Sequence, residues 1–441
     1  MHLLRFSGPV PVPAAVFLFM VLLSCSPSQK GIFAKKTPHE KYADGLQSAG
    51  LHTSAMGRQW LAAAQKSLGQ PLSISLPYRE TGYFAADKPG AAGYRFTAKR
   101  GERLSVKLTT VPATGTLVFT ELWEARAAGE APRLLGVTDT ATQQLEYDVE
   151  NEAGFLVRVQ PELLKGVEYT LVISTAPSLA FPVQSSGNPR IISTWGAGRD
   201  GGSRSHEGID ISAKFRTPAL AAADGRVTSV TDNNLGGKVV FMRPQGKNYN
   251  LYYAHLDSQI AASGQSVKKG DVLGLVGNTG NARNTVPHLH FGIYTMGGAI
   301  DPLPFVNPDR PAIPAITAPL KVVNGFVRNT VPASLYATPS AKGEVMERLA
   351  ANTIVQVLGA AGSWYRVVLP DQREGFIASS SVTAAPLRTI NTRQETRLLD
   401  APFATAAAKK LVPSGARLTL VGEYGNHYLA QHDEVVGWIS K

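Results

Sequence analysis

Cysteine is almost absent from this chain of 441 residues, which contains a single one, Cys25. A lone cysteine excludes an intramolecular disulfide and a cysteine-based metal cluster. Charge is also sparse: charged residues make up 17% of the chain, and no dense block of Lys or Arg carries the formal net charge of +11. A thinly spread excess of positive charge speaks against a nucleic-acid groove and favours mild attraction to an anionic surface.

No hydrophobic run is long enough to span a bilayer as a helix, because the apolar stretch from about Val10 to Leu23 falls short of the roughly 18 residues required. Preceded by Arg5, this stretch is typical of a signal peptide. It ends in a segment that resembles the lipobox of bacterial lipoproteins, Leu22-Leu23-Ser24-Cys25. The resemblance implies a signal over 1–25 and a lipidated Cys25 that anchors the protein to a membrane of the bacterial cell envelope, on its periplasmic or extracytoplasmic side. The alternative is a small buried cysteine in an ordinary secretory signal.

The length suggests about three folded units, on a prior of roughly 150 residues per domain. Hydrophobic residues at 44% exclude a disordered chain, and 42 Gly with 29 Pro indicate many turns. We therefore predict a mainly β, multidomain protein. Residues 26–71 are predicted as a polar tether followed by one or two short helices, because Met56, Trp60 and Ala64 follow helical spacing.

From 72 to 178 the apolar residues alternate with a period of two, as in Leu104, Val106 and Leu108, which predicts an N-terminal β-sandwich domain. The stretch 309–320 is predicted to be a Pro-rich linker. Beyond it the chain repeats itself with a register of about 63 residues. The segment Gly375-Phe376-Ile377, for example, is echoed by Gly437-Trp438-Ile439.

Such units of short strands resemble bacterial SH3-like domains, so we expect two SH3-like barrels, at 321–384 and 385–441. The resemblance implies that they bind peptidoglycan. For Phe376 and Trp438 we expect core positions rather than a ligand-binding surface.

Histidines that could bind a metal gather in the remaining domain, predicted over 179–308. His206 precedes a strand in which Ile209 and Ile211 alternate with Asp210, so that the carboxylate points away from the core toward His206. His288 and His290 lie two residues apart on a strand and must face the same side. The last of the group, His255, is expected at the end of a strand.

An imidazole, a carboxylate and a second imidazole form a three-ligand set for Zn²⁺ that leaves the fourth position free, as catalytic zinc sites do. Further histidines beside such a site could accept a proton from water or hydrogen-bond an oxyanion. The alternative is a set of histidines buried for structural reasons alone.

Three segments at this point are similar to the signature segments of lysostaphin-type (LytM-like) zinc endopeptidases: His206-x-x-x-Asp210, Tyr253-Ala254-His255-Leu256 and His288-x-His290. The resemblance covers about residues 185–305 and implies an antiparallel β peptidase domain with one Zn²⁺. By the family pattern His206, Asp210 and His290 bind the metal, while His255 and His288 act in catalysis. The stretch from Asn281 to Val286 departs from the family's usual shorter loop, which leaves substrate preference open.

The sequence therefore predicts a zinc metallo-endopeptidase that hydrolyses peptide cross-links of peptidoglycan, with no nucleic-acid partner. One alternative is a non-catalytic LytM-type regulator of cell-wall amidases; the presence of all five site residues argues against it. The other alternative is a wall-binding lipoprotein without activity. The sequence does not specify which peptide bond is cut or the oligomeric state.

Overall fold

The computed structural model describes residues 35–139 and 142–441. Cys25 and the predicted signal lie outside these residues. Two α-helices come first along the described chain, α1 (Pro38–Ser48) and α2 (Ala55–Gly69). Thr37 caps α1 by accepting a hydrogen bond from the backbone N–H of Glu40, whose own side chain accepts one from Thr37 N–H. None of the helices in the described part of the chain is long and apolar enough to cross a membrane.

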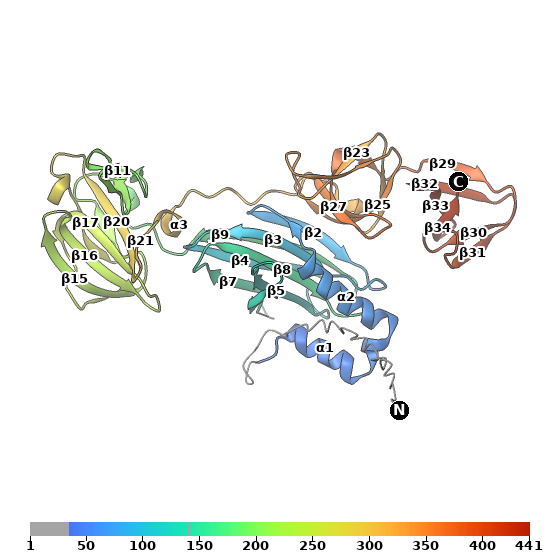
Figure 1. Cartoon of the computed structure of the whole chain (residues 1–441), viewed down its shortest axis with the longest axis horizontal. Helices are drawn as coiled ribbons and strands as arrows, with labels where there is room; N and C mark the ends of the chain where they lie inside the picture. The colour runs from blue at the N-terminus through green and yellow to red at the C-terminus, as the bar shows by residue number, and fades with distance from the viewer. Residues whose placement is uncertain (1–34, 140–141) are drawn as a thin grey trace, which may run out of the picture. The chain divides into compact units, whose positions relative to one another are not determined.

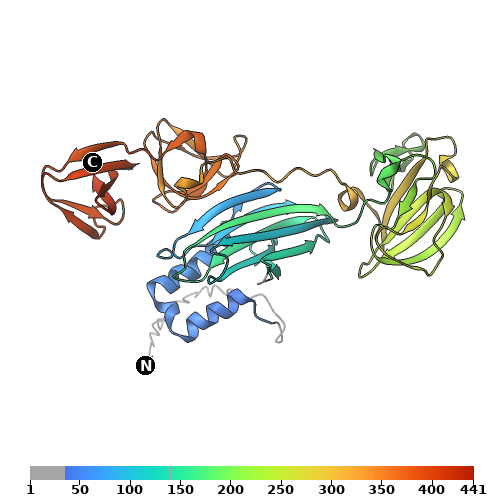
Figure 2. The same ribbon diagram turned by 180° about the vertical axis from the view of Figure 1, so that it is seen from behind.

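Residues 72–177 form two packed β-sheets (Figure 1), and α2 runs beside them in both views (Figures 1 and 2). One sheet has the order β1-β3-β8-β5-β6, and the other contains β2-β9-β4-β7. Alternate residues of both sheets, such as Tyr94, Leu104 and Leu171, fill one buried core between them. The strands are β1 (Leu72–Ser73), β2 (Tyr78–Phe84), β3 (Ala92–Ala98), β4 (Glu102–Val111), β5 (Val118–Glu124), β6 (Arg133–Val137), β7 (Gln144–Asp148), β8 (Ala153–Pro161) and β9 (Val167–Pro177).

The following segment builds a mainly antiparallel sheet with the order β10-β13-β20-β17-β16-β15-β18, to which β14, β19 and β21 add. Its core is apolar and includes Ile209, Leu289 and Phe291. The elements are β10 (Arg190–Ser193), β11 (Gly198–Arg199), β12 (Arg204–Ser205), β13 (Ile209–Ser212), β14 (Pro218–Leu220), β15 (Gly225–Asn233), β16 (Gly237–Pro244), β17 (Asn250–Gln259), β18 (Ser266–Val267), β19 (Val272–Val276), β20 (His288–Thr295), β21 (Gly298–Ile300) and the short helix α3 (Leu303–Val306).

Two small β units end the chain and share one strand order. The first runs β24-β23-β27-β26-β25 with β22 and β28 added, and the second runs β31-β30-β34-β33-β32-β29. Phe376 and Trp438 are both buried, as predicted. The strands are β22 (Phe326–Asn329), β23 (Ala333–Tyr336), β24 (Val345–Leu349), β25 (Ile354–Ala361), β26 (Trp364–Val368), β27 (Glu374–Ala378), β28 (Val382–Thr383), β29 (Arg388–Asn391), β30 (Thr396–Leu399), β31 (Ala408–Val412), β32 (Arg417–Tyr424), β33 (His427–His432) and β34 (Val435–Ser440).

Short 3₁₀ turns join several of these elements: η1 (Leu51–Thr53), η2 (Ser185–Gly187), η3 (Asp200–Gly202), η4 (Gly280–Ala282), η5 (Leu320–Val322) and η6 (Ser379–Ser381). The predicted mainly β, multidomain architecture is confirmed.

The first C-terminal unit is joined to the sandwich through backbone pairing. β2 pairs with β25, Thr81 lying opposite Ala360 and Gly82 opposite Gly359, so the two form one continuous sheet. Close approach requires glycine here, because a Cβ on Gly359 would lie 2.8 Å from Glu80 Oε1.

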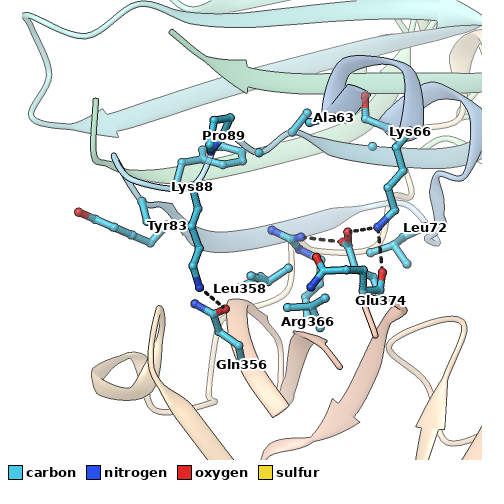
Figure 3. Close-up of a pocket in the computed structure, with 18 of the residues that line it drawn as sticks. Ala63, Lys66, Leu72, Tyr83, Lys88, Pro89, Gln356, Leu358, Arg366 and Glu374 are labelled. Atoms are coloured by element: carbon cyan, nitrogen blue, oxygen red, sulfur yellow. Dashed lines mark hydrogen bonds and ion pairs between the residues drawn. The ribbon is translucent and has the colours of Figure 1, made fainter. Parts of the chain in front are cut away.

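A pocket of about 220 Å³ lies between the sandwich and the first C-terminal unit (Figure 3). Beside it, Lys66 of α2 donates a hydrogen bond to Glu374 of β27, and Lys88 donates one to Gln356 of β25. Residues separated by hundreds of positions in the sequence thus meet in one interface.

Candidate active site

Two neighbouring strands bring a carboxylate and a histidine face to face. β13 and β20 pair antiparallel, with Asp210 directly opposite His290. Directly opposed residues on neighbouring strands point to the same face of the sheet. The flanking residues point to the other face and are fully buried in the core: Ile209, Ile211, Leu289 and Phe291. The alternation inferred from the sequence therefore holds on both strands.

His206 lies in the short connection between β12 and β13 and completes a group of three. Its Nε2 is 3.0 Å from Asp210 Oδ1 and 3.0 Å from His290 Nδ1. His290 Nδ1 is in turn 3.0 Å from Asp210 Oδ1. One donor atom from each of these residues lies within 4.8 Å of the others, close enough to hold a single metal ion.

Gly208 makes room for this arrangement. A Cβ at that position would lie 2.7 Å from Cε1 and Nε2 of His290, closer than side-chain atoms normally approach. The residue at position 208 therefore has to be small for the ring of His290 to occupy its place.

The sequence predicted His255 at the end of a strand, and this prediction is wrong. His255 lies inside β17, which continues to Gln259. Its φ of 60° is left-handed, and the pairing of β17 with β16 shifts register beside it. Tyr253 and Leu256, three positions apart, both enter the core. The irregularity breaks the alternation and turns His255 toward the cavity, as β-bulges commonly do beside active sites.

His288 lies near His255, with their ring centroids 5.0 Å apart. Each ring is held through Nδ1, which lies 2.9 Å from a backbone carbonyl oxygen, that of Thr279 for His255 and that of Val286 for His288. Only a protonated Nδ1 donates to a carbonyl, so in the neutral rings Nε2 carries the lone pair. His206 is held in the same way by the Thr194 carbonyl, 3.0 Å from its Nδ1.

Burial and the neighbouring groups set the charge states. Burial, reinforced by His288 and His290, lowers the pKa of His255 to about 4. Burial also lowers the pKa of His290, although Asp210 opposes the shift. For Asp210 burial acts to raise the pKa, but the close contacts of its carboxylate with His206 and His290 outweigh burial and hold the pKa well below its usual range. At neutral pH the site thus contains an ionised Asp210 carboxylate and a neutral His255.

A cavity of about 660 Å³ opens over these groups, lined by all five predicted residues. Its walls carry aromatic side chains, Tyr252 and Tyr294 among them, and the exposed Leu235. Asn281 and Thr285 also line it. The segment in which the sequence departs from the usual family pattern therefore forms part of the cavity wall.

The donor set fits Zn²⁺. Two imidazole nitrogens and one carboxylate oxygen suit zinc better than calcium or magnesium, which prefer oxygen ligands. The carbonyl of Thr194 orients His206 so that Nε2 faces Asp210, and such outer hydrogen bonds are typical of histidines that ligate metals.

Arg199 was not singled out from the sequence. It lies on β11 and donates to Asp210 Oδ2 at 2.6 Å. Its surroundings in the chain, Gly196-Ala197-Gly198-Arg199-Asp200-Gly201-Gly202, indicate only turns, and no periodicity assigns the side chain a direction.

The comparison with family models gives two matches. Residues 204–302 match peptidase family M23, and residues 332–383 match the bacterial SH3 domain.

Similar proteins match only part of this chain. An L-Ala–D-Glu endopeptidase of Bacillus subtilis is 36% identical over 140 residues, which are 29% of this chain and 43% of the relative. An uncharacterized lipoprotein of Escherichia coli, YgeR, is 38% identical over 109 residues, 25% of this chain and 41% of the relative. The chain thus spans less than half the length of either protein.

Among solved structures, the catalytic domain of the antimicrobial peptidase lysostaphin from Staphylococcus simulans is 27% identical, with a TM-score of 0.25, covering 28% of this chain and 97% of that domain. By the two family matches, the chain contains a peptidase domain of the M23 type, in which the five predicted site residues lie, together with a bacterial SH3 domain.

Proposed function

We propose that this protein is a zinc-dependent endopeptidase that hydrolyses peptide cross-links of peptidoglycan in the bacterial cell envelope. The observation that carries the proposal is that donor atoms of His206, Asp210 and His290 lie within 4.8 Å of one another in the lining of a cavity that two further histidines also line. The likeness to the Bacillus subtilis L-Ala–D-Glu endopeptidase supports the reaction class. A non-catalytic regulator would not need all five side chains.

In this proposal His206 Nε2, Asp210 Oδ1 and His290 Nδ1 hold Zn²⁺. Bound there, Zn²⁺ supplies Lewis acidity that activates water and polarises the peptide carbonyl.

His255 and His288 supply the proton transfers. With its pKa near 4, His255 is neutral at pH 7 and accepts a proton at Nε2 from the attacking water. Once protonated, an imidazole of this pair donates a hydrogen bond to the developing oxyanion or a proton to the leaving amine. The backbone carbonyls of Thr279 and Val286 keep both rings oriented through these steps.

Chelation tests the proposal directly. We expect a strong chelator to abolish the release of soluble fragments from purified peptidoglycan and Zn²⁺ to restore it, because without the metal no Lewis acid polarises the peptide carbonyl and lowers the pKa of the attacking water. The fragments are identified by mass spectrometry, which also shows which bond is cut. Full activity in protein whose metal content is measured as zero would exclude the zinc mechanism.

We also propose that Cys25 is lipidated and anchors the protein to a membrane. The lipobox-like segment supports this assignment, as does the likeness to an E. coli lipoprotein. Acyl chains stabilise membrane binding by about 0.8 kcal/mol for each buried methylene, so two or more chains anchor stably. Cys25→Ser is expected to remain unprocessed and to leave the detergent phase on phase partitioning. Wild-type protein found wholly in the aqueous phase would contradict lipidation.

Residues 385–441 are, in our proposal, a second SH3-like domain, and both units bind peptidoglycan. The shared strand order of the two units supports the first statement. An experimental structure in which the two units differ in strand order would refute it, and failure of the isolated second unit to sediment with insoluble peptidoglycan would argue against its part in wall binding.

A further inference from the structure

Arg199 connects the β11–β12 hairpin to the predicted metal ligand Asp210. Its Nη2 donates to Asp210 Oδ2 at 2.6 Å and to Ser193 Oγ of β10 at 2.9 Å. Ser193 Oγ lies 3.3 Å from His206 Nδ1, so the guanidinium, the hydroxyl and the histidine form one chain of contacts. The Arg199 and Asp210 side chains are mostly shielded from solvent, with exposed fractions of 29% and 12%.

The two oxygens of Asp210 have separate tasks. Oδ1 faces the nitrogens of His206 and His290, whereas Oδ2 faces Arg199. A carboxylate can rotate about its last bond and can offer a metal one oxygen or both. A guanidinium on Oδ2 suppresses this freedom, because a charge-assisted hydrogen bond at 2.6 Å is lost if the group turns.

We propose that Arg199 is a positioning residue for the metal site: it holds Asp210 Oδ2 so that Oδ1 alone is presented between His206 and His290. The inference rests on the proposed function insofar as these three residues bind Zn²⁺. Partners that orient a metal ligand typically change metal affinity or activity by about 10- to 100-fold when removed.

The sign of the effect separates positioning from simple charge. A cation beside the site repels Zn²⁺, so by Coulomb's law alone its removal would tighten zinc binding. Positioning predicts the reverse, because an untethered carboxylate pays the entropy of being fixed when the metal binds. The measured direction therefore decides between the two roles.

The experiment is a zinc competition titration of the full chain against a chromogenic chelator, which needs no substrate. We expect Arg199→Gln to weaken zinc binding by about 10- to 100-fold, and Arg199→Lys by less, because an ammonium keeps the charge but lacks the planar fork. Arg216→Gln is the matched control: Arg216 pairs with the carboxylate of Asp257 in the same domain, is exposed and does not line the cavity. Its zinc affinity should equal that of the wild type.

Chemical rescue guards against a merely misfolded variant. Arg199→Ala leaves a guanidinium-sized space beside Asp210, and guanidinium added far below denaturing concentrations should restore much of the lost zinc affinity. Sodium chloride at the same concentration should not. A structural defect elsewhere would respond to neither salt.

Unchanged or tighter zinc binding in Arg199→Gln, with a wild type that binds one zinc, would overturn the role of Arg199 and leave the proposed function standing. A wild type that binds no zinc would overturn both. Weaker binding that guanidinium does not restore in Arg199→Ala would also count against positioning.

Discussion

His290→Ala and Asp210→Ala are expected to lose bound zinc together with activity, whereas His255→Ala and His288→Ala are expected to keep zinc and lose only activity. The difference follows from the geometry. The first two residues face each other across β13 and β20 with their donor atoms 3.0 Å apart, while the rings of His255 and His288 are held by backbone carbonyls beside that group. Removing a ligand leaves an incomplete donor set, and zinc binding then fails.

For the second pair we expect losses on the order of 10²-fold or more in turnover, the usual contribution of a group that transfers a proton or stabilises an oxyanion. Zinc content is measured by mass spectrometry of the purified variants and turnover with a soluble cross-linked muropeptide. His432→Ala serves as the control, since His432 lies on β33 of the last β unit and its Nδ1 bonds to the Arg417 carbonyl. One zinc per chain in His290→Ala and none in His288→Ala would reverse the assignment.

The ligand strands could be predicted because they obey a simple rule. Ile209 and Ile211 on one strand and Leu289 and Phe291 on the other are buried, and strict alternation then places the residues between them on the opposite face. His255 does not follow this alternation. Its left-handed φ and the adjacent register shift come from a bulge, and no alternation of apolar residues marks such a bulge in advance.

Contacts between distant segments could not be predicted from the sequence, for a different reason. Arg199 acts on Asp210 across a glycine-rich hairpin whose course depends on backbone torsions that glycine leaves open. Likewise, β2 and β25 pair although more than 250 residues separate them, and nothing in either strand identifies its partner. The sequence predicted a Pro-rich linker ahead of two C-terminal barrels and indicated no pairing between them and the sandwich; in the structure the first unit continues the sheet of the sandwich.

Breaking one ion pair where β2 of the sandwich meets the first C-terminal unit is expected to destabilise the protein severely. Glu80 of β2 and Arg366 of β26 are almost completely buried, and Arg366 Nε lies 3.1 Å from Glu80 Oε1. The hydroxyls of Tyr78, Tyr94 and Tyr169 also donate to the carboxylate at 2.6–2.7 Å. Both oxygens of the Glu80 carboxylate thus accept hydrogen bonds. A buried charge is tolerated under this condition.

We expect Arg366→Met to lower the free energy of unfolding by about 3–5 kcal/mol, because Glu80 then stays buried without its counter-charge. Arg373→Gln is the matched control. Arg373 is also an arginine of the first C-terminal unit and pairs with Asp371, but it is exposed, and surface pairs contribute only about 0–1 kcal/mol. Urea denaturation followed by tryptophan fluorescence measures both variants.

Hydrogen exchange locates the damage. If the ion pair holds the two domains together, amides of β2 and β25 exchange faster in Arg366→Met while those of β13 and β20 keep their wild-type protection, because the β2–β25 junction and the metal site have separate cores. A double variant, Glu80→Gln with Arg366→Met, should recover part of the lost stability, since no unpaired charge remains buried. Equal urea midpoints for Arg366→Met and Arg373→Gln, with unchanged exchange in β25, would show that backbone pairing alone joins the sandwich to the first C-terminal unit.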